Sequence, residues 1–403
     1  MEIGFKENLT WLKSGGDASG FSITINVTER CNLDCVYCYE HSKYEHGKKG
    51  RDFDLNAVLS KLDEILVGLR GRSRIGISFC GGEPLLAFEN IQAVFNHVVK
   101  NYIRDETWNV PFGFDLTTNG TILTAKMREW FEQHPCFGIG LSMDGTPEAH
   151  NRNRSGSYDR LAKNLPFFRR YGNPVKMTIG PESLPDVAAG IKHITSLGLE
   201  VTSNVVFEDV WGDDVEQLKH LMVFADQLSE LIDYYSSNPE VPRTNLVRPL
   251  IECLPIDEEV EARRYCGSGT HMAVIDVDGR DYPCHRFAPM SCKRNPDGIS
   301  FDDVSIKPEM CASCPLVSMC PTCYGYNFEY HGDIDRRTTF HCAFFKLQVR
   351  SAASLIFRDI ERLKQQVDIA SLSGDEKSEL SRKLQAALHI EEFTRPFYTS
   401  LYQ

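Results

Sequence analysis

The chain has 403 residues, of which 42% are hydrophobic and 25% charged, and it carries a formal net charge of −12 at pH 7. This composition is ordinary for a globular protein and excludes a collagen-like or disordered chain. The negative charge argues against nucleic acid as the main partner, because phosphate binding requires a basic surface. No stretch approaches the roughly 20 apolar residues of a membrane-spanning helix, and Met1 to Gly20 lacks the apolar core of a signal peptide. We therefore expect a cytoplasmic protein without membrane attachment.

Residues 21–235 alternate between strand-like and helix-like segments. The predicted strands are Ser22–Thr28, Ile75–Phe79, Phe112–Leu116, Phe137–Met143, Val175–Ile179 and Glu200–Phe207. Helical spacing of apolar residues follows at Leu55–Leu69, Ile91–Tyr102, Ala125–Phe131 and Tyr158–Tyr171, and again after the last two strands. Repeated βα units build a parallel sheet covered by helices, with the active site at the carboxyl ends of the strands. The pattern predicts an α/β fold, a partial (β/α)6 TIM-like parallel barrel.

The βα rhythm stops after residue 235. Residues 236–255 contain four prolines and are typical of a linker. Residues 256–345 are crowded with cysteines, and residues 346–403 have a helical pattern of apolar residues. Together with an N-terminal segment, 1–20, this predicts a barrel, a small cysteine-rich domain and a C-terminal helix.

Fourteen cysteines are the unusual feature of the composition. Cytosolic thiols stay reduced, so regular spacing indicates metal binding or catalysis and not disulfides. Ten cysteines fall into two regular groups, which leave out Cys80, Cys136, Cys253 and Cys292. We interpret Cys80, Cys136 and Cys253 as small buried hydrophobic residues.

The first group is Cys31, Cys35 and Cys38, a C-x3-C-x2-C run directly after the first strand. Three thiolates can hold three irons of a [4Fe–4S] cluster and leave the fourth iron open to a cosubstrate. Zinc fits this spacing poorly, since structural zinc sites use four ligands, usually in C-x2-C pairs. Tyr37, just before the third cysteine, is placed to pack over the cluster.

This loop resembles the cluster loop of radical S-adenosylmethionine (SAM) enzymes, and further matches follow in that family's order over roughly residues 20–210. The Gly81-Gly82-Glu83-Pro84 run resembles the stretch that holds the methionine ammonium, where glycines admit the backbone and a carboxylate pairs with the charge. Asn119 and Ser142 end the third and fourth strands at cofactor-contacting positions of the family. Arg154 resembles the arginine that takes the methionine carboxylate. The resemblance thus implies a cofactor site made of Tyr37, Gly81, Gly82, Glu83, Asn119, Ser142 and Arg154.

The second group spans 77 residues and resembles the SPASM extension, which houses two auxiliary [4Fe–4S] clusters. Its cysteines are Cys266, Cys284, Cys311, Cys314, Cys320, Cys323 and Cys342. The resemblance implies that Cys311, Cys314, Cys320 and Cys342 hold the distal cluster, and that Cys266, Cys284 and Cys323 hold the cluster nearer the active site. A zinc ribbon is the alternative, built on two C-x2-C pairs, but its pairs would be only five residues apart.

Two departures from the family pattern bear on the nearer cluster. Only two residues separate Cys320 from Cys323, where the family usually has three. Met272 stands where some members carry a fourth cysteine ligand. Either Cys292 or another residue completes this cluster, or one iron stays open and would bind a substrate thiolate.

The resemblance implies an oxidoreductase-type enzyme with three [4Fe–4S] clusters and SAM, which is cleaved reductively to give a radical that removes hydrogen from the substrate. The expected substrate is a peptide or protein, as in the biosynthesis of ribosomally made, modified peptides (RiPPs), and the expected product carries a thioether or carbon–carbon cross-link. A low-potential donor of the flavodoxin or ferredoxin type would supply electrons. Only about 20 residues precede the first strand, too few for a leader-binding module, so a separate leader-binding protein or a groove on this chain would recognise the substrate.

Three alternatives stay open. Formylglycine-generating sulfatase maturases have an aspartate base where this chain has His285, directly after Cys284. Histidine titrates near neutrality and can serve as a base, or His285 can be a structural neighbour of the cluster. A radical dehydrogenase of a small molecule is the second alternative. A non-catalytic iron–sulfur electron carrier or scaffold is the third.

Overall fold

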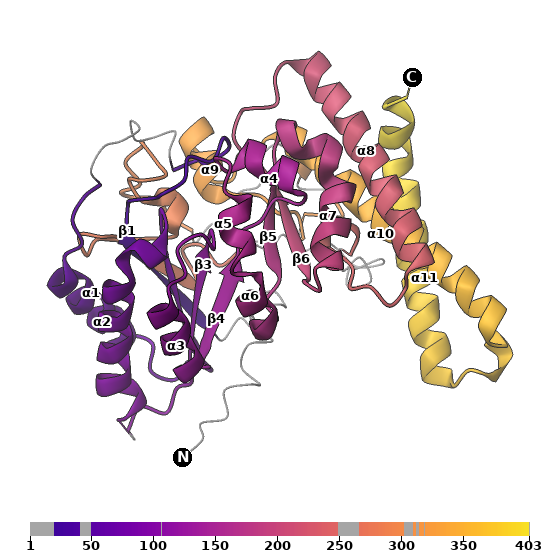
Figure 1. The fold of residues 1–403 in the computed structure, drawn as a ribbon. Coiled ribbons are helices and arrows are strands. Elements are labelled where there is room, and N and C mark those ends of the chain that lie inside the picture. Colours follow the sequence, from indigo (N-terminus) through magenta and orange to yellow (C-terminus); the bar gives the residue numbers. More distant parts are fainter. Residues whose placement is uncertain are drawn as a thin grey trace.

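The computed structural model describes residues 20–40, 50–105, 107–248, 266–301, 309–311, 314–317 and 319–402 (Figure 1). The predictions for residues 1–19, for Cys253 and for the boundary at residue 256 lie outside the described residues. None of the helices in these ranges is long and apolar enough to cross a lipid bilayer.

Six parallel strands form the expected partial barrel. They are β1 (Phe21–Thr28), β2 (Ile75–Gly81), β3 (Phe112–Thr118), β4 (Phe137–Leu141), β5 (Val175–Ile179) and β6 (Val201–Val205). β1 to β4 pair in parallel, β5 pairs with β6, and a single parallel bridge between Ser142 and Lys176 joins the two sets. The predicted α/β fold is therefore confirmed.

Helices cover the outer face of these strands (Figure 1). They are α1 (Leu55–Val67), α2 (Phe88–Val98), α3 (Ala125–Gln133), α4 (Pro147–Asn153), α5 (Tyr158–Ala162), α6 (Leu165–Tyr171), α7 (Val187–Ser196) and α8 (Asp214–Ser237). Strand residues alternate between the two faces of a sheet. In β1, Ile23, Ile25 and Val27 are fully buried in the core, so the alternate residues, Thr24 and Asn26 among them, face the barrel interior.

The cysteine-rich region adds two strands to the same sheet, which the sequence did not predict. β7 (Met272–Ile275) pairs in parallel with β1, and β8 (Asp281–Tyr282) pairs with β7 in antiparallel fashion, giving the order β4-β3-β2-β1-β7-β8. The buried Asn26 amide donates to Asp276 across this junction at 3.0 Å. Gly279, in the turn after β7, has φ +80° and packs against Ala57, where a Cβ atom would lie 2.7 Å from the Ala57 backbone carbon. The second cysteine group is thus attached directly to the barrel.

The described part of the predicted linker, residues 236–248, packs against the protein. Thr244 and Leu246 are buried, and the Asn245 side chain bonds the Ser203 backbone on β6 at 2.7 and 2.8 Å. Arg243 donates twice to Asp359, both at 2.7 Å, and so ties this segment to the C-terminal helices.

The predicted C-terminal helix is present as two helices, α10 (Thr339–Gln366) and α11 (Gly374–Ser400), which pack on each other with α8 alongside α10 (Figure 1). α10 and α11 are separate helices because Ser373 caps the N-terminus of α11. The Ser373 hydroxyl accepts from the Glu376 backbone N–H, and the Glu376 carboxylate accepts from the Ser373 N–H, a capping box. α9 (Tyr324–His331) follows Cys323 directly and precedes α10 in the chain.

Candidate functional site

The first cysteine loop is fixed by hydrogen bonds to the carboxyl ends of neighbouring strands. The Asn32 side-chain amide donates to the Thr121 hydroxyl at 2.8 Å, and the Asn119 side-chain amide donates to Oδ1 of Asn32 at 2.9 Å. The Asp34 backbone exchanges two hydrogen bonds with the Ser155 hydroxyl, at 2.9 and 3.0 Å. These contacts hold the loop that carries Cys31, Cys35 and Cys38, three residues that are half-buried.

Burial keeps the thiols of Cys31 and Cys35 protonated in the metal-free chain. It raises the pKa of Cys31 to about 12, and the carboxylate of Glu83 adds to that shift. Burial also raises the pKa of Cys35, which the neighbouring Arg154 guanidinium opposes. Since thiolates are the ligands, iron binding must displace these protons, which couples metal binding to pH.

Glu83 is buried, and three of the roughly four acceptor positions of its carboxylate face donors. One oxygen accepts from the Thr118 hydroxyl at 2.7 Å and the Leu85 backbone N–H at 3.0 Å, and the other from the Asn119 N–H at 2.8 Å. The turn before it requires glycine, because Gly81 has φ +132° and a Cβ atom there would lie 2.0 Å from the Thr28 carbonyl oxygen. Two of the predicted cofactor residues, Glu83 and Asn119, are therefore brought together next to the cysteine loop.

Arg154 and Tyr37, predicted from distant positions, meet at Asp144. Arg154 donates to the two Asp144 oxygens at 2.9 and 3.2 Å, and the Tyr37 hydroxyl donates to Asp144 at 2.5 Å. The guanidinium carbon also lies 5.4 Å from the Tyr37 ring centre. Asp144 is 0% exposed and accepts from the Thr178 N–H at 3.1 Å. An arginine has five N–H donors, so its pairing with Asp144 leaves donors for a second carboxylate.

Asp144 was not among the predicted site residues. Its position two residues after Ser142, just beyond the end of β4, could have indicated that it belongs to the site. Ser142 itself is placed by its backbone N–H, which donates to the Thr118 carbonyl at 2.9 Å. The Asp144 backbone N–H donates to Nδ1 of His150 at 3.3 Å. The ring of His150 is thereby built into the same network.

Polar side chains occupy the interior of the barrel. The Ser78 hydroxyl on β2 donates to Asp115 on β3 at 2.6 Å, and Lys176 on β5 donates to Thr117 on β3 at 2.8 Å. Cys80, which we interpreted as a small buried hydrophobic residue, is half-buried beside these polar side chains. Burial raises the pKa of its thiol to about 12. Cys136 is half-buried against the hydrophobic core.

The two cysteine regions meet at the mouth of the barrel. Arg286, two residues after Cys284, lies with its guanidinium carbon 4.0 Å from the ring centre of Tyr39, one residue after Cys38. Arg286 also donates to Glu208 at 2.5 Å. His285 lies 6.0 Å from Tyr39, ring centre to ring centre.

Burial, with Arg286 and Lys176 nearby, lowers the pKa of His285 to about 4, so its imidazole is neutral at pH 7. A neutral imidazole at this junction can accept a proton from a bound substrate.

The structure separates the second cysteine group into two sets. Burial raises the pKa of Cys284 to about 12, and Cys323 and Cys266 lie near enough to add to that shift. Cys320, likewise raised to about 12, is influenced by Cys342, Cys314 and Cys311. These proximities are compatible with the two ligand sets that the resemblance implies, which stay a prediction. We call Cys311, Cys314, Cys320 and Cys342 the distal set.

Cys292 points elsewhere. It is buried, and its thiol donates to the Glu329 carboxylate at 3.0 Å and contacts the Arg294 carbonyl at 3.5 Å. Neither contact involves a cysteine of the two sets.

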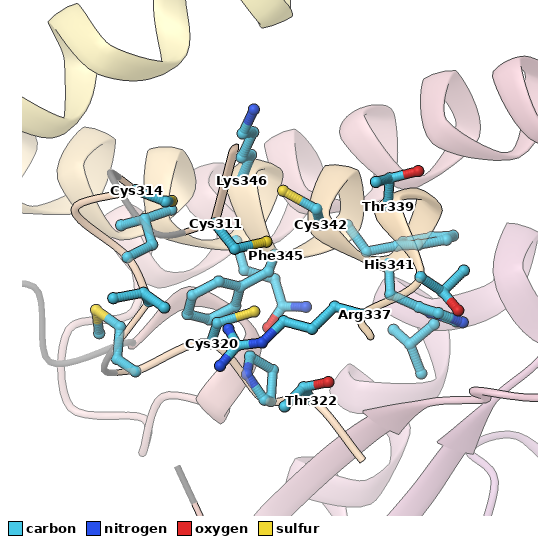
Figure 2. Close-up of a pocket in the computed structure, with 18 of the residues that line it drawn as sticks. Cys311, Cys314, Cys320, Thr322, Arg337, Thr339, His341, Cys342, Phe345 and Lys346 are labelled. Carbon is cyan, nitrogen blue, oxygen red and sulfur yellow. The ribbon is translucent and has the colours of Figure 1, made fainter. Parts of the chain in front are cut away.

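The distal set lines a cavity of about 570 Å³ between β6, the cysteine-rich loop and α10 (Figure 2). The thiols of Cys311, Cys314, Cys320 and Cys342 are spread over its wall. A single zinc ion needs four sulfurs that converge at about 2.3 Å on one point. A cavity walled by separated thiols suits a cluster of several irons.

Comparison with known proteins finds a family match for part of the chain. Residues 25–189 match the Radical SAM superfamily. Over 188 residues the chain is 26% identical to an uncharacterized protein of Methanocaldococcus jannaschii, covering 45% of this chain and 60% of the other. A cysteine-type anaerobic sulfatase-maturating enzyme of Clostridium novyi is 27% identical over 152 residues, covering 36% of this chain and 39% of the enzyme. The chain thus spans less than two thirds of the length of either relative.

A solved structure extends the likeness beyond the barrel. Native anSMEcpe with bound AdoMet and Cp18Cys peptide superposes with a TM-score of 0.61 and 18% sequence identity, over 86% of this chain and 100% of the other. At this identity the comparison shows a common fold. The superposition covers 86% of this chain and therefore extends well beyond the matched residues 25–189.

Proposed function

Because the chain carries a radical SAM domain over residues 25–189, we propose that it is a radical SAM enzyme that abstracts hydrogen from a peptide or protein and oxidises it, with a thioether or carbon–carbon cross-link as the product. The observation that carries this proposal is the junction of Tyr39 and Arg286, which places the second cysteine group against the first at the barrel mouth. A substrate in the polar interior would lie between the two.

The cofactors of the proposed enzyme are three [4Fe–4S] clusters and SAM, supplied with electrons by a flavodoxin- or ferredoxin-type donor. Cys31, Cys35 and Cys38 would hold the cluster that supplies the electron for reductive cleavage of SAM. Glu83, with its oxygens already oriented by Thr118 and Asn119, would accept the methionine ammonium. Arg154 would use its remaining donors for the methionine carboxylate.

The chain's own residues contribute positioning and proton handling. His285, neutral and at the junction of the two cysteine regions, would take the proton that leaves the substrate when it is oxidised. Closure of the barrel around Ser78, Asp115 and Lys176 would exclude water from the radical. These polar groups would orient the peptide segment that carries the reacting carbon.

The sulfatase-maturating relative and the peptide-bound solved structure favour a peptide over a small molecule. A sulfatase-maturating enzyme acts on a protein, as its name states, and the related solved structure holds a Cp18Cys peptide. Formylglycine formation is the second candidate function, with His285 as the base in place of aspartate. Incubating the enzyme with cysteine-containing peptides distinguishes the two, because a cross-link joins two residues of the peptide whereas formylglycine alters one.

The nearer auxiliary cluster would have three cysteine ligands, with an open iron for a substrate thiolate. The contact between Cys292 and Glu329 supports this, because it directs the thiol to a carboxylate. A Cys292→Ala variant should keep all its iron and the same cluster absorption. Loss of iron in that variant would assign Cys292 as the fourth ligand.

The cluster count tests the proposal as a whole. After anaerobic reconstitution we expect about twelve irons per chain, falling to about eight when Cys31, Cys35 and Cys38 are all replaced by alanine. Cys136→Ala is the matched control, because Cys136 packs against the core outside both groups, and it should keep about twelve irons. About four irons in the wild type, or zinc in place of iron, would overturn the assignment of the second cysteine group.

A further inference from the structure

The distal cavity is electrostatically unlike the rest of the chain. The chain as a whole has a net charge of −12, yet the described lining of the cavity includes three basic side chains and no carboxylate. The basic residues are Arg248, Arg337 and Lys346. Because a protein surface of one sign concentrates ions of the other, this lining is suited to an anionic occupant.

Arg337 is a basic lining residue whose side chain lies inside the cavity. Its side chain is only 8% exposed, and Figure 2 shows it extending through the cavity until its guanidinium lies beside Cys320. In the part of the chain that the structure describes, no carboxylate lies within ion-pair distance of it. The wall of the cavity that Arg337 enters carries the thiols of Cys311, Cys320 and Cys342.

The side chain of Lys346 differs from that of Arg337 in its direction and in its neighbours. In Figure 2 it points away from the thiols toward α11, and its ammonium lies 5.6 and 5.4 Å from the ring centres of Phe393 and Phe397. Those aromatic faces already stabilise its charge. Arg337 has no such partner among the described residues.

The backbone around Arg337 is held in place by its neighbours. The buried Asn327 amide on α9 donates to the Ile334 carbonyl at 2.9 Å, and the Asp335 N–H donates to the Asp333 carboxylate at 3.0 Å. Burying a guanidinium without a counter-charge is strongly unfavourable. A fold that fixes such a residue here requires negative charge in the cavity.

We infer that Arg337 is a positioning residue that compensates the charge of the distal auxiliary cluster and thereby raises its reduction potential. This inference rests on the proposed function, which supplies the cluster. A [4Fe–4S] cluster held by four thiolates is anionic and gains one further negative charge when it takes up one electron. A fixed cation beside it therefore favours the reduced form. A higher potential favours transfer of the single electron that leaves the oxidised substrate.

The test is a redox titration that is monitored by electron paramagnetic resonance. It is done in the Cys31/Cys35/Cys38 triple-alanine background, so that only the auxiliary clusters contribute to the signal. Arg337→Gln should lower the midpoint potential of one cluster so that its reduced-to-oxidised ratio at a fixed potential falls at least tenfold, which corresponds to about 59 mV for one electron. Arg336→Gln is the matched control, because the neighbouring Arg336 is exposed, and it should leave the potential unchanged.

The outcomes separate the inference from the proposed function. An Arg337→Gln variant that keeps about eight irons and has the potential of the Arg336→Gln control overturns the inference and leaves the proposed function intact. About four irons or fewer in the triple-alanine background itself overturns the auxiliary-cluster assignment. If Arg337→Gln cannot hold the distal cluster, Arg337→Lys decides: restored iron supports a role of charge, and iron lost in both variants overturns it.

Discussion

The barrel site and the distal cavity solve the problem of buried charge in opposite ways. In the barrel, each buried charge has a partner within the chain: Asp144 pairs with Arg154, and Glu83 accepts from Thr118 and Asn119. In the distal cavity, the described lining around Arg337 carries four cysteine thiols and no carboxylate. The first site is organised by the polypeptide before any cofactor binds. The second is electrostatically complete only with an anionic occupant, so its structure should depend on iron.

The largest expected effect is therefore on the response to iron removal. Anaerobic chelation of the reconstituted protein should release the distal region, since structural metal binding is also folding energy. Hydrogen exchange followed by mass spectrometry should show fast exchange in residues 309–345 and unchanged protection in β1 to β4. Uniform loss of protection in both regions would contradict the comparison, and so would protection unchanged in the distal region.

The second prediction breaks the barrel's internal pairing. Asp144→Asn removes the charge opposite Arg154 in a site that is 0% exposed. Leaving a buried charge unpaired should lower the free energy of unfolding of the barrel by about 3–5 kcal/mol, measured by urea denaturation. Asp186→Asn is the control, because Asp186 pairs with Arg152 at the surface, and it should cost no more than about 1 kcal/mol. Equal losses in the two variants would mean that the buried pair does not organise the site.

Much of this comparison could be predicted from the sequence, because it depends on local periodicity and spacing. Alternation of apolar residues located all six barrel strands, and the cysteine spacings separated two groups before the structure placed them. The capping box of Ser373 and Glu376, which divides the C-terminal helix in two, was also visible as an S-x-x-E pattern but was missed within a continuous helical periodicity.

Other features depend on contacts that no local pattern contains. β7 has four residues, too few for a periodicity signal, and its pairing with β1 joins positions some 250 residues apart, as the Asn26–Asp276 bond does. Asp144 resembles any aspartate at a strand end until Tyr37 and Arg154 converge on it. That Arg337 is buried without a carboxylate beside it is likewise a property of the folded chain, since basic residues in a sequence are usually at the surface.

The third prediction uses pH to test the barrel network. Burial, with Arg154 nearby, lowers the pKa of His150 to about 4, against about 6.5 in an unfolded chain. Because the unfolded chain gains the proton more readily, the stabilisation is complete above about pH 6.5 and is lost as the pH falls toward 4. The total is about 3 kcal/mol.

His150→Gln should remove this dependence. The difference in free energy of unfolding between wild type and variant should therefore change by about 3 kcal/mol between pH 7.5 and 4. Both proteins retain His285 and His341, whose pKa values burial also lowers to about 4, so their contribution cancels in the difference. A difference that stays constant over this range would show that His150 is not held neutral by the fold.

The smallest expected effect tests how far the barrel site is organised in advance for the cofactor. Thr118→Val removes the hydroxyl that donates to Glu83 at 2.7 Å and keeps the side-chain shape. Burial raises the pKa of Glu83 and the Thr118 hydrogen bond opposes that rise, so loss of the hydroxyl favours the protonated carboxyl, which does not pair with an ammonium. A hydrogen bond to a charged group is worth about 1.5 kcal/mol or somewhat more. If Glu83 holds the methionine ammonium, the Kd for SAM should rise about tenfold. Isothermal titration of the reconstituted protein measures it, with Thr118→Ser, which keeps the donor, expected near the wild-type value. Equal affinity in the valine variant would mean that the backbone N–H groups of Asn119 and Leu85 orient Glu83 without help from the hydroxyl.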